Sequence, residues 1–242
     1  MPLLQSIFPR TDMWDDFKSQ FILNFVDDGR WHYLANGLLV TLKLTFFAVL
    51  LGLVLGFCIA MIRNIHDNTG KLKIANFICN LYLTVIRGTP VVVQLMIIYF
   101  VIFGSVRVDK AFTAILAFGI NSGAYQAEIF RSGIQSIPKG QMEAGRSLGF
   151  SYLQTMTRII MPQAIKNVVP TLLNEVITLL KETSVAGYIA LEDLTKGGDI
   201  IRSRTYSAFM PLIAVAFIYL IMVRILEKLA KVVERRLKKN EK

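Results

Sequence analysis

The sequence predicts an all-α integral membrane protein with five membrane-spanning helices, and its composition supports this fold class. Hydrophobic residues make up 54% of the 242 residues, and charged residues only 18%, whereas soluble domains contain about 25% charged residues. Residues 44–62 and 206–223 are two long stretches without a charged side chain. Since a hydrocarbon core of about 30 Å requires about 20 apolar residues in a helix, both stretches can span a membrane.

The apolar part of the chain covers residues 34–226, and five spans are expected within it. Arg87-Gly88-Thr89-Pro90 interrupts the second span, where Pro90 either starts the span proper or kinks it. The fourth span is the least apolar of the five. The expected spans are about residues 34–62, 74–104, 111–130, 164–180 and 208–226.

The segments outside the spans differ in composition. In residues 1–33, outside the membrane, Phe17, Phe21 and Phe25 recur at helical spacing, which indicates either a short helix in the membrane interface or a disordered leader. Residues 131–163 form a polar loop after the third span. An exterior connection is expected over residues 181–207, and a basic tail over residues 227–242.

The net charge of +10 is concentrated at one end of the chain, because eight of the 27 basic residues follow Val223. No nucleic-acid motif accompanies them, so a cytoplasmic anchor facing anionic lipid is expected instead. With five spans and a cytoplasmic C-terminus, the inner segments hold seventeen basic residues and the outer segments nine. The positive-inside rule therefore places the polar loop in the cytoplasm and the N-terminus outside.

Few residues carry catalytic or metal-binding chemistry. Cys58 and Cys79 lie in or beside apolar stretches, without a C-x-x-C motif or a neighbouring histidine. His32 and His66 lie in expected loops and have no serine or carboxylate partner at a supporting spacing. The G-x-x-x-x-G-K-[ST] phosphate loop is also missing, so the chain is expected to be neither an enzyme nor an ATPase.

The polar loop is predicted to fold into two short helices joined at a glycine. Gln141–Leu148 contains good helix formers, and Gly149 follows where a left-handed cap is needed. Ser151 and Gln154 have the spacing of a capping box for a second helix, which Pro162 is expected to end. Such a loop either docks a partner protein or folds on itself for stability.

Polar residues inside the expected spans are candidates for a substrate path. A carboxylate near mid-membrane costs roughly 2.5–3.5 kcal/mol, so Glu175 is a functional candidate. Asn174 and Thr178 share a helical face, which Lys181 extends. Interhelical hydrogen bonding is the alternative role for such residues. A second polar face, on the third span, holds Asn121, Ser122 and Tyr125, and Glu128 is expected to pair with Arg131.

The order Glu143-Ala144, Gly149 and Ile159-x-x-Pro162 resembles the signature loop of permease subunits of ABC importers. The chain resembles the subfamily that imports polar amino acids such as histidine, glutamine, arginine and cystine, and the likeness covers residues 35–235. It departs at Gly145, where the family more often has alanine and where glycine could loosen the helix by up to about 1 kcal/mol. Further stretches of the chain that resemble this subfamily are residues 86–90 with Gln94, 122–125 with Glu128, 137–141, 161–164, and 174–175 with 180–184.

The resemblance implies the type I permease fold of ABC importers, in a prokaryotic inner or plasma membrane. The loop 138–162 would couple the substrate path to an ATPase subunit through Glu143, Ala144, Gly145, Leu148 and Gly149. The substrate path would include Asn174, Glu175, Thr178, Asn121, Ser122, Tyr125 and Gln94.

The resemblance also implies partners. These are two ATPase subunits that use ATP and Mg²⁺, a second permease subunit of the same or a related chain, an extracytoplasmic amino-acid-binding protein and membrane lipid. The chain itself would need no cofactor and no nucleic acid. Cationic, neutral polar and acidic amino acids remain open as substrates. The alternative function is an ion-coupled secondary transporter or a channel without an ATPase partner.

Overall fold

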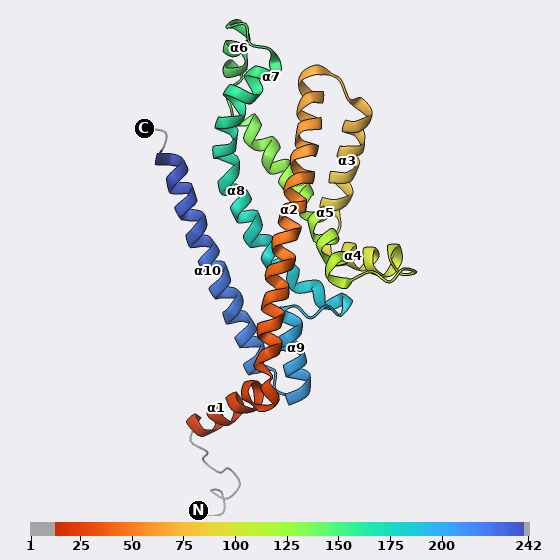
Figure 1. Cartoon of the computed structure of the whole chain (residues 1–242), viewed down its shortest axis with the longest axis vertical. Coiled ribbons are helices and arrows are strands. Elements are labelled where there is room, and N and C mark those ends of the chain that lie inside the picture. The colour runs from red at the N-terminus through yellow and green to blue at the C-terminus, as the bar shows by residue number, and fades with distance from the viewer. Residues whose placement is uncertain (1–12, 240–242) are drawn as a thin grey trace, which may run out of the picture.

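The computed structural model describes residues 13–239, and every regular element within them is a helix. The longest helices run along one axis, and α2 (Trp31–Thr69) extends through most of the molecule (Figure 1). At 1.5 Å per residue this helix is about 58 Å long, so it projects beyond the expected span of 34–62 at both ends. The helices α6 and α7 lie at one end of the molecule, and α1 and α9 at the other (Figure 1).

The helix α5 (Lys110–Gln135) packs closely along α2 through glycines on both helices. A Cβ added at Gly52 would lie 2.6 Å from Gln126 Nε2, and one at Gly56 would lie 2.8 Å from Gln126 Cβ. On α5, Gly119 and Gly123 have the same four-residue spacing. This small-x-x-x-small pattern permits close backbone approach within a membrane, so the two helices form the central pair of the bundle.

The second apolar segment, expected over about residues 74–104 with an interruption at residues 87–90, is bent at that interruption. The helix α3 (Lys73–Gly88) is followed by α4 (Val91–Met96) and the π-helical η3 (Ile97–Ile102), with a bend of 108° between them. Pro90 has an extended backbone at the break and lacks an N–H group. Gln94 Nε2 donates instead to Ile86 O and Thr89 O, at 2.7 and 3.0 Å, which satisfies carbonyls that the break frees.

The second helix of the polar loop continues into the fourth span, where the sequence predicted an end at Pro162. After α6 (Lys139–Ser147), the helix α7 (Tyr152–Thr155) leads through a π-helical turn, η4 (Met156–Ile160), into α8 (Met161–Glu182). Pro162 lies in the first turn of α8, where a missing N–H group is tolerated. The loop is therefore joined rigidly to α8.

The end opposite the loop is also helical. The expected exterior connection 181–207 contains the 3₁₀-helical η5 (Thr183–Ile189) and α9 (Leu194–Thr205). The N-terminal segment contains α1 (Met13–Phe21), η1 (Ile22–Val26) and η2 (Asp27–Gly29); the rest of the expected leader, residues 1–12, lies outside the described residues. Buried Asn24 ties this segment to α9, because its Oδ1 accepts from Thr205 Oγ1 at 2.8 Å.

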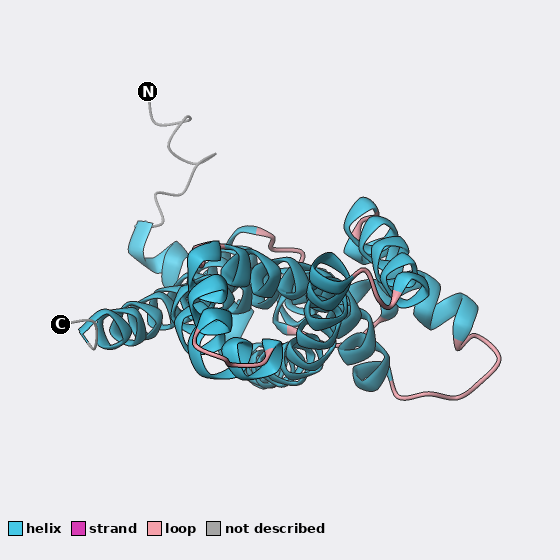
Figure 2. Ribbon diagram, turned by 90° about the horizontal axis from the view of Figure 1, so that it is seen from above, coloured by secondary structure: helices cyan, strands magenta, loops and turns pink. Residues whose placement is uncertain are grey.

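The last helix, α10 (Phe209–Lys239), continues through the expected tail without a break at residue 226. It stands at one side of the bundle, and the α4–η3 segment lies at the other (Figure 2). By length and hydropathy, α2 and α10 can each cross a membrane, and the bent α3–α4–η3 pair would be a third crossing. The helices α5 and α8 are long enough as well, but they carry the polar side chains described next.

Candidate functional site

The polar loop is fixed by local backbone geometry. Gly149 ends α6 with a φ of +85°, and Phe150 N donates to Gly145 O at 3.1 Å. Ser151 and Gln154 form the predicted capping box: Gln154 N donates to Ser151 Oγ at 3.2 Å, and Ser151 N donates to Gln154 Oε1 at 2.8 Å. These contacts make the turn between the two helices rigid.

Gly145 differs from the other residues predicted to couple the loop to a partner, because it is buried within the loop. A Cβ at this position would lie 2.5 Å from Thr155 Cγ2 and 3.1 Å from Ile159 Cδ1. The close approach that the missing side chain permits is therefore to Thr155 of the same chain. A glycine here brings α6 and α7 together instead of opening the loop to another surface.

Glu143, Ala144, Leu148 and Gly149 face outward at the tip of the loop. Leu148 is 77% exposed, and Leu153, which the sequence reasoning missed, is 69% exposed. Two large apolar side chains on a short polar loop, well away from the long apolar helices, indicate a contact surface. The signal for Leu153 was its place in the first turn after the capping serine.

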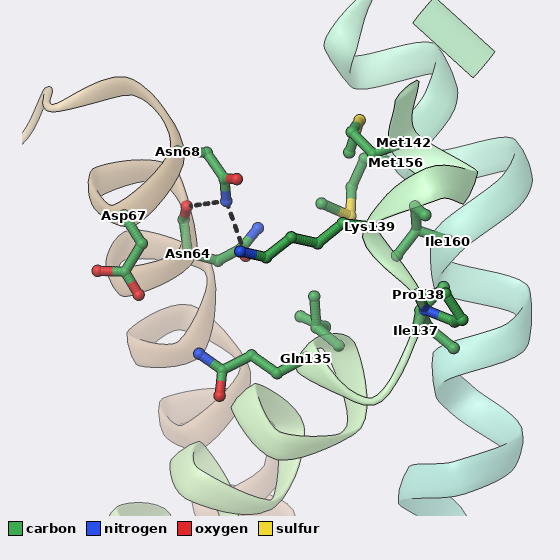
Figure 3. A pocket seen from close by; sticks show the side chains of 11 residues that line it. Asn64, Asp67, Asn68, Gln135, Ile137, Pro138, Lys139, Met142, Met156 and Ile160 are labelled. Atoms are coloured by element: carbon green, nitrogen blue, oxygen red, sulfur yellow. Dashed lines mark hydrogen bonds between the residues drawn. The ribbon is translucent and has the colours of Figure 1, made fainter. Parts of the chain in front are cut away.

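The base of the loop rests on α5 and α8. Ile134, Met156, Ile160 and Ala164 form its buried apolar cluster. Beside it lies a pocket of about 400 Å³ between the loop and the end of α2, with Lys139 reaching across toward α2 (Figure 3).

One hydrogen bond crosses from α2 to α7 beside this pocket. Asn64 Nδ2 on α2 donates to Tyr152 Oη at 3.0 Å. Burial raises the pKa of the Tyr152 phenol above its usual value, while the hydrogen bond from Asn64 acts in the opposite direction. The loop is thus attached to α2 as well as to α5 and α8.

The predicted pair between Glu128 and Arg131 is wrong. Glu128 Oε1 instead lies 2.5 Å from Arg63 Nη1 and 3.5 Å from Arg87 Nη1. Arg131 Nη2 pairs with Asp67 Oδ2 at 3.0 Å. Both carboxylates therefore connect different helices rather than stabilising α5 alone.

A buried polar network connects α4, α5 and α8 among the residues predicted for the substrate path. Ser122 Oγ donates to Glu175 Oε1 at 2.9 Å, and Gln126 Nε2 donates to Ser122 Oγ at 2.9 Å. Asn121 Nδ2 donates to Gln94 Oε1 at 3.0 Å. Asn121 and Gln94 are bonded to each other and buried, which favours a scaffolding role for this pair. The role of these residues in binding stays a prediction.

The remaining predicted residues lie on the surface of the chain. Asn174 and Thr178 are exposed on one face of α8, which Lys181 continues. Asn167 and Thr171, which the sequence reasoning did not single out, extend this face toward the loop, so five polar side chains follow one line along α8. Tyr125 is exposed on α5, with the Arg87 guanidinium 5.7 Å from its ring centroid.

Comparison with known proteins identifies the type of protein that has this arrangement. Residues 48–239 match the family described as binding-protein-dependent transport system inner membrane component. A putative glutamine transport system permease protein of Rickettsia typhi is 38% identical over 207 residues, which cover 85% of this chain and 93% of the relative. The arginine transport system permease protein of Bacillus subtilis is 38% identical over 211 residues, which cover 86% and 94%.

A solved structure agrees in fold and sequence. The chain is 42% identical to a protein chain in the crystal structure of an amino acid ABC transporter with histidines, with a TM-score of 0.77 over 84% of this chain and 94% of that one. This agreement argues against the alternative function, an ion-coupled secondary transporter or a channel. The chain is not an enzyme, since the relatives are permease subunits and ATP hydrolysis belongs to a separate subunit. The chain therefore belongs to the inner membrane components of binding-protein-dependent transport systems, as a permease of the ABC amino acid importers.

Proposed function

We propose that the chain forms the path for a polar amino acid and couples that path to ATP hydrolysis through the loop 138–162. The observation that supports coupling through this loop is that Leu148 and Leu153 are exposed on a rigidly capped loop. Burying exposed apolar side chains such as these against a partner protein stabilises the complex, because apolar surface is removed from water. The partner is an ATPase subunit, which holds ATP and Mg²⁺; this chain contributes no cofactor.

The proposed assembly holds two ATPase subunits, a second permease of the same or a related chain, and an extracytoplasmic binding protein. The loop, the α2–α3 turn and the end of α10 lie toward one end of the molecule, and α1 lies at the other (Figure 1). The excess of basic residues in the segments at the loop end supports a cytoplasmic loop and C-terminus and an external N-terminus.

The polar face of α8 supports a substrate path along this helix. Residues 167, 171, 174, 178 and 181 are all polar and exposed in the chain, at alternating spacings of four and three residues. A helix in a bilayer does not present such a line to hydrocarbon, because each polar group would lose its hydrogen bonds. The face therefore lies against water or against a second permease.

Glu175 is the candidate for substrate discrimination, since its carboxylate lies beside this face and is held by Ser122. A carboxylate attracts a cationic amino acid, while the relatives are named for glutamine and arginine. A cationic or neutral polar amino acid is therefore the proposed substrate, and an acidic one is disfavoured.

The test is ATP hydrolysis by the permease–ATPase complex, reconstituted with its binding protein and supplied with one amino acid at a time. We expect stimulation by arginine, glutamine or a similar polar amino acid. Glu175→Gln should lower uptake of arginine relative to glutamine roughly tenfold, or about 1.4 kcal/mol. Glu227→Gln, on α10, is the matched control. Stimulation by glutamate alone would remove the role given to Glu175.

A further inference from the structure

The helix α3 has a polar face that the substrate path described above does not include. Five of its exposed side chains are large and apolar, at 74, 77, 78, 81 and 85, which places this part of α3 against lipid. Asn80, Thr84 and Arg87 lie at the same depth on another exposed face. Within a bilayer this second face has to lie against water or against a polar partner.

A hollow of about 430 Å³ opens at this face, between α2, α3 and α5. Its charged groups are Arg63, Arg87 and Glu128, which together carry one net positive charge. Both guanidiniums point to the same oxygen, Glu128 Oε1, but at different distances, 2.5 Å from Arg63 and 3.5 Å from Arg87. The hollow is lined by Arg63, Asn80, Leu83, Thr84, Arg87, Gly88 and Glu128.

Arg87 is the group in this hollow that is free to bind something else. Its side chain is 44% exposed, and within residues 13–239 its guanidinium contacts only Glu128 at 3.5 Å and the ring of Tyr125. Arg63, in contrast, is largely buried and bound to Glu128 at close range. A guanidinium with unused donors binds a carboxylate through two parallel hydrogen bonds.

We propose that this hollow binds the backbone of an α-amino acid, with Arg87 on the α-carboxylate and Glu128 on the α-ammonium group. Every α-amino acid carries these two charges whatever its side chain, and the hollow presents one group for each. Its volume lies within the range of about 300–1,000 Å³ for small-molecule sites. Asn80 and Thr84 provide further polar groups on the same wall.

The proposed site is a second site, apart from the polar line on α8 and closer to the coupling loop than Glu175. On α5, Glu128 lies six residues beyond Ser122 in the direction of the loop, which is about 9 Å along the helix. Glu175, held by Ser122, would distinguish side chains, whereas the hollow would bind the part common to all substrates. This inference rests on the proposed function, because it assumes that amino acids pass this face.

Cysteine labelling in the reconstituted permease–ATPase complex tests the proposal. Thr84→Cys is introduced after replacement of both native cysteines, Cys58 and Cys79, and is reacted with a negatively charged thiosulfonate. Val85→Cys, its neighbour on the lipid face, is the matched control. We expect Thr84→Cys to react and Val85→Cys to stay unmodified.

Protection by ligand then identifies what the hollow binds. Glutamine or arginine at ten times its Kd occupies about nine-tenths of the sites and should slow the reaction at Thr84→Cys about tenfold. The corresponding amides, which lack the α-carboxylate, should not protect. Adding Arg87→Gln should abolish protection by the amino acids while leaving Thr84→Cys reactive.

Three results would overturn the proposal. The first is a Thr84→Cys thiol that does not react, and the second is a reaction that no amino acid slows in a complex whose ATP hydrolysis amino acids still stimulate. This second result would leave the proposed function intact. The third is the absence of any stimulation in the wild-type complex with its binding protein, which would contradict the proposed function itself and the inference with it.

Discussion

The coupling loop and the interior polar network are stabilised in opposite ways. In the loop, the defining contacts are local: Ser151 and Gln154 are three residues apart, and Phe150 bonds to Gly145 five residues back. In the network, Ser122 and Glu175 are 53 residues apart in the sequence. The loop is thus a preformed unit that exposes its apolar side chains, whereas the network exists only when several helices are assembled.

The two regions are mechanically connected because α5 and α8 belong to both. From the loop, α5 runs about 20 Å to Ser122 and α8 runs about 21 Å to Glu175. A displacement of the loop is therefore expected to change the distance between these two side chains. Reversing a 1:99 population of two states requires about 5.5 kcal/mol of differential interaction, which only a rigid connection can transmit.

The largest expected effect comes from the exposed tip of the loop. Leu148→Ala should weaken the association of the permease with its ATPase subunit about 30-fold, since losing the burial of a leucine side chain costs about 2 kcal/mol. Binding of the purified ATPase to the permease in nanodiscs measures the change. Ser147→Ala, the adjacent exposed residue, is the control and should leave affinity unchanged. Equal losses in both variants would show that Leu148 is not an anchor.

The packing inside the loop should have a somewhat smaller effect. Gly145→Ala places a methyl group against Thr155 and should destabilise the loop by about 1–2 kcal/mol, as overpacking does elsewhere. Hydrogen exchange of the amides of α6 and α7 reports this change. Gly140→Ala, on the same helix but with nothing within 4 Å of the added Cβ, serves as the control and should slightly stabilise α6. Combining Gly145→Ala with Thr155→Ala should restore much of the protection.

In the interior network, Ser122→Ala should lower amino-acid uptake by a few-fold while preserving binding of the ATPase. The expected loss of uptake corresponds to the contribution of one hydrogen bond to a carboxylate. That contribution is about 1.5 kcal/mol, or less where water can replace the hydroxyl group. Ser132→Ala removes an exposed hydroxyl of the same helix and is the control. If Ser122→Ala instead weakened ATPase binding as much as Leu148→Ala, the two regions would not be separate in function.

The smallest effect is expected at Asp67, which pairs with Arg131 near the loop. Both side chains are partly exposed, so the pair should contribute less than about 1 kcal/mol. Asp67→Asn should therefore change neither uptake nor the thermal midpoint of the complex beyond a small shift. A large loss of ATPase coupling would mean that this pair, and not the apolar tip, transmits the movement.

The sequence predicted the features that depend on neighbouring residues. The left-handed Gly149, the capping box at Ser151 and the interruption near Pro90 follow from backbone rules that act within a few positions. The five-helix fold class followed from hydropathy and from the resemblance together. The shared face of Asn174 and Thr178 on α8 also followed from their helical spacing.

Features that depend on distant partners could not be predicted in this way. Glu128 pairs with Arg63, 65 residues away, and nothing in the local spacing distinguishes that partner from Arg131. The bend of 108° after α3 and the contact of Gly145 with Thr155 likewise depend on tertiary packing. The four-residue glycine spacing on α2 and α5 was a signal in the sequence that could have indicated their pairing.

The central claim is that an ATPase subunit holds the loop at Leu148. A benzophenone attached to Leu148→Cys, in a chain without its native cysteines, tests this claim by photo-cross-linking in native membranes. We predict an adduct with the mass of one permease and one ATPase subunit, and none from the same probe at Tyr206→Cys, which is exposed at the opposite end. An adduct with an extracytoplasmic protein at Leu148→Cys, or labelling of this position from outside the cell, would contradict the account.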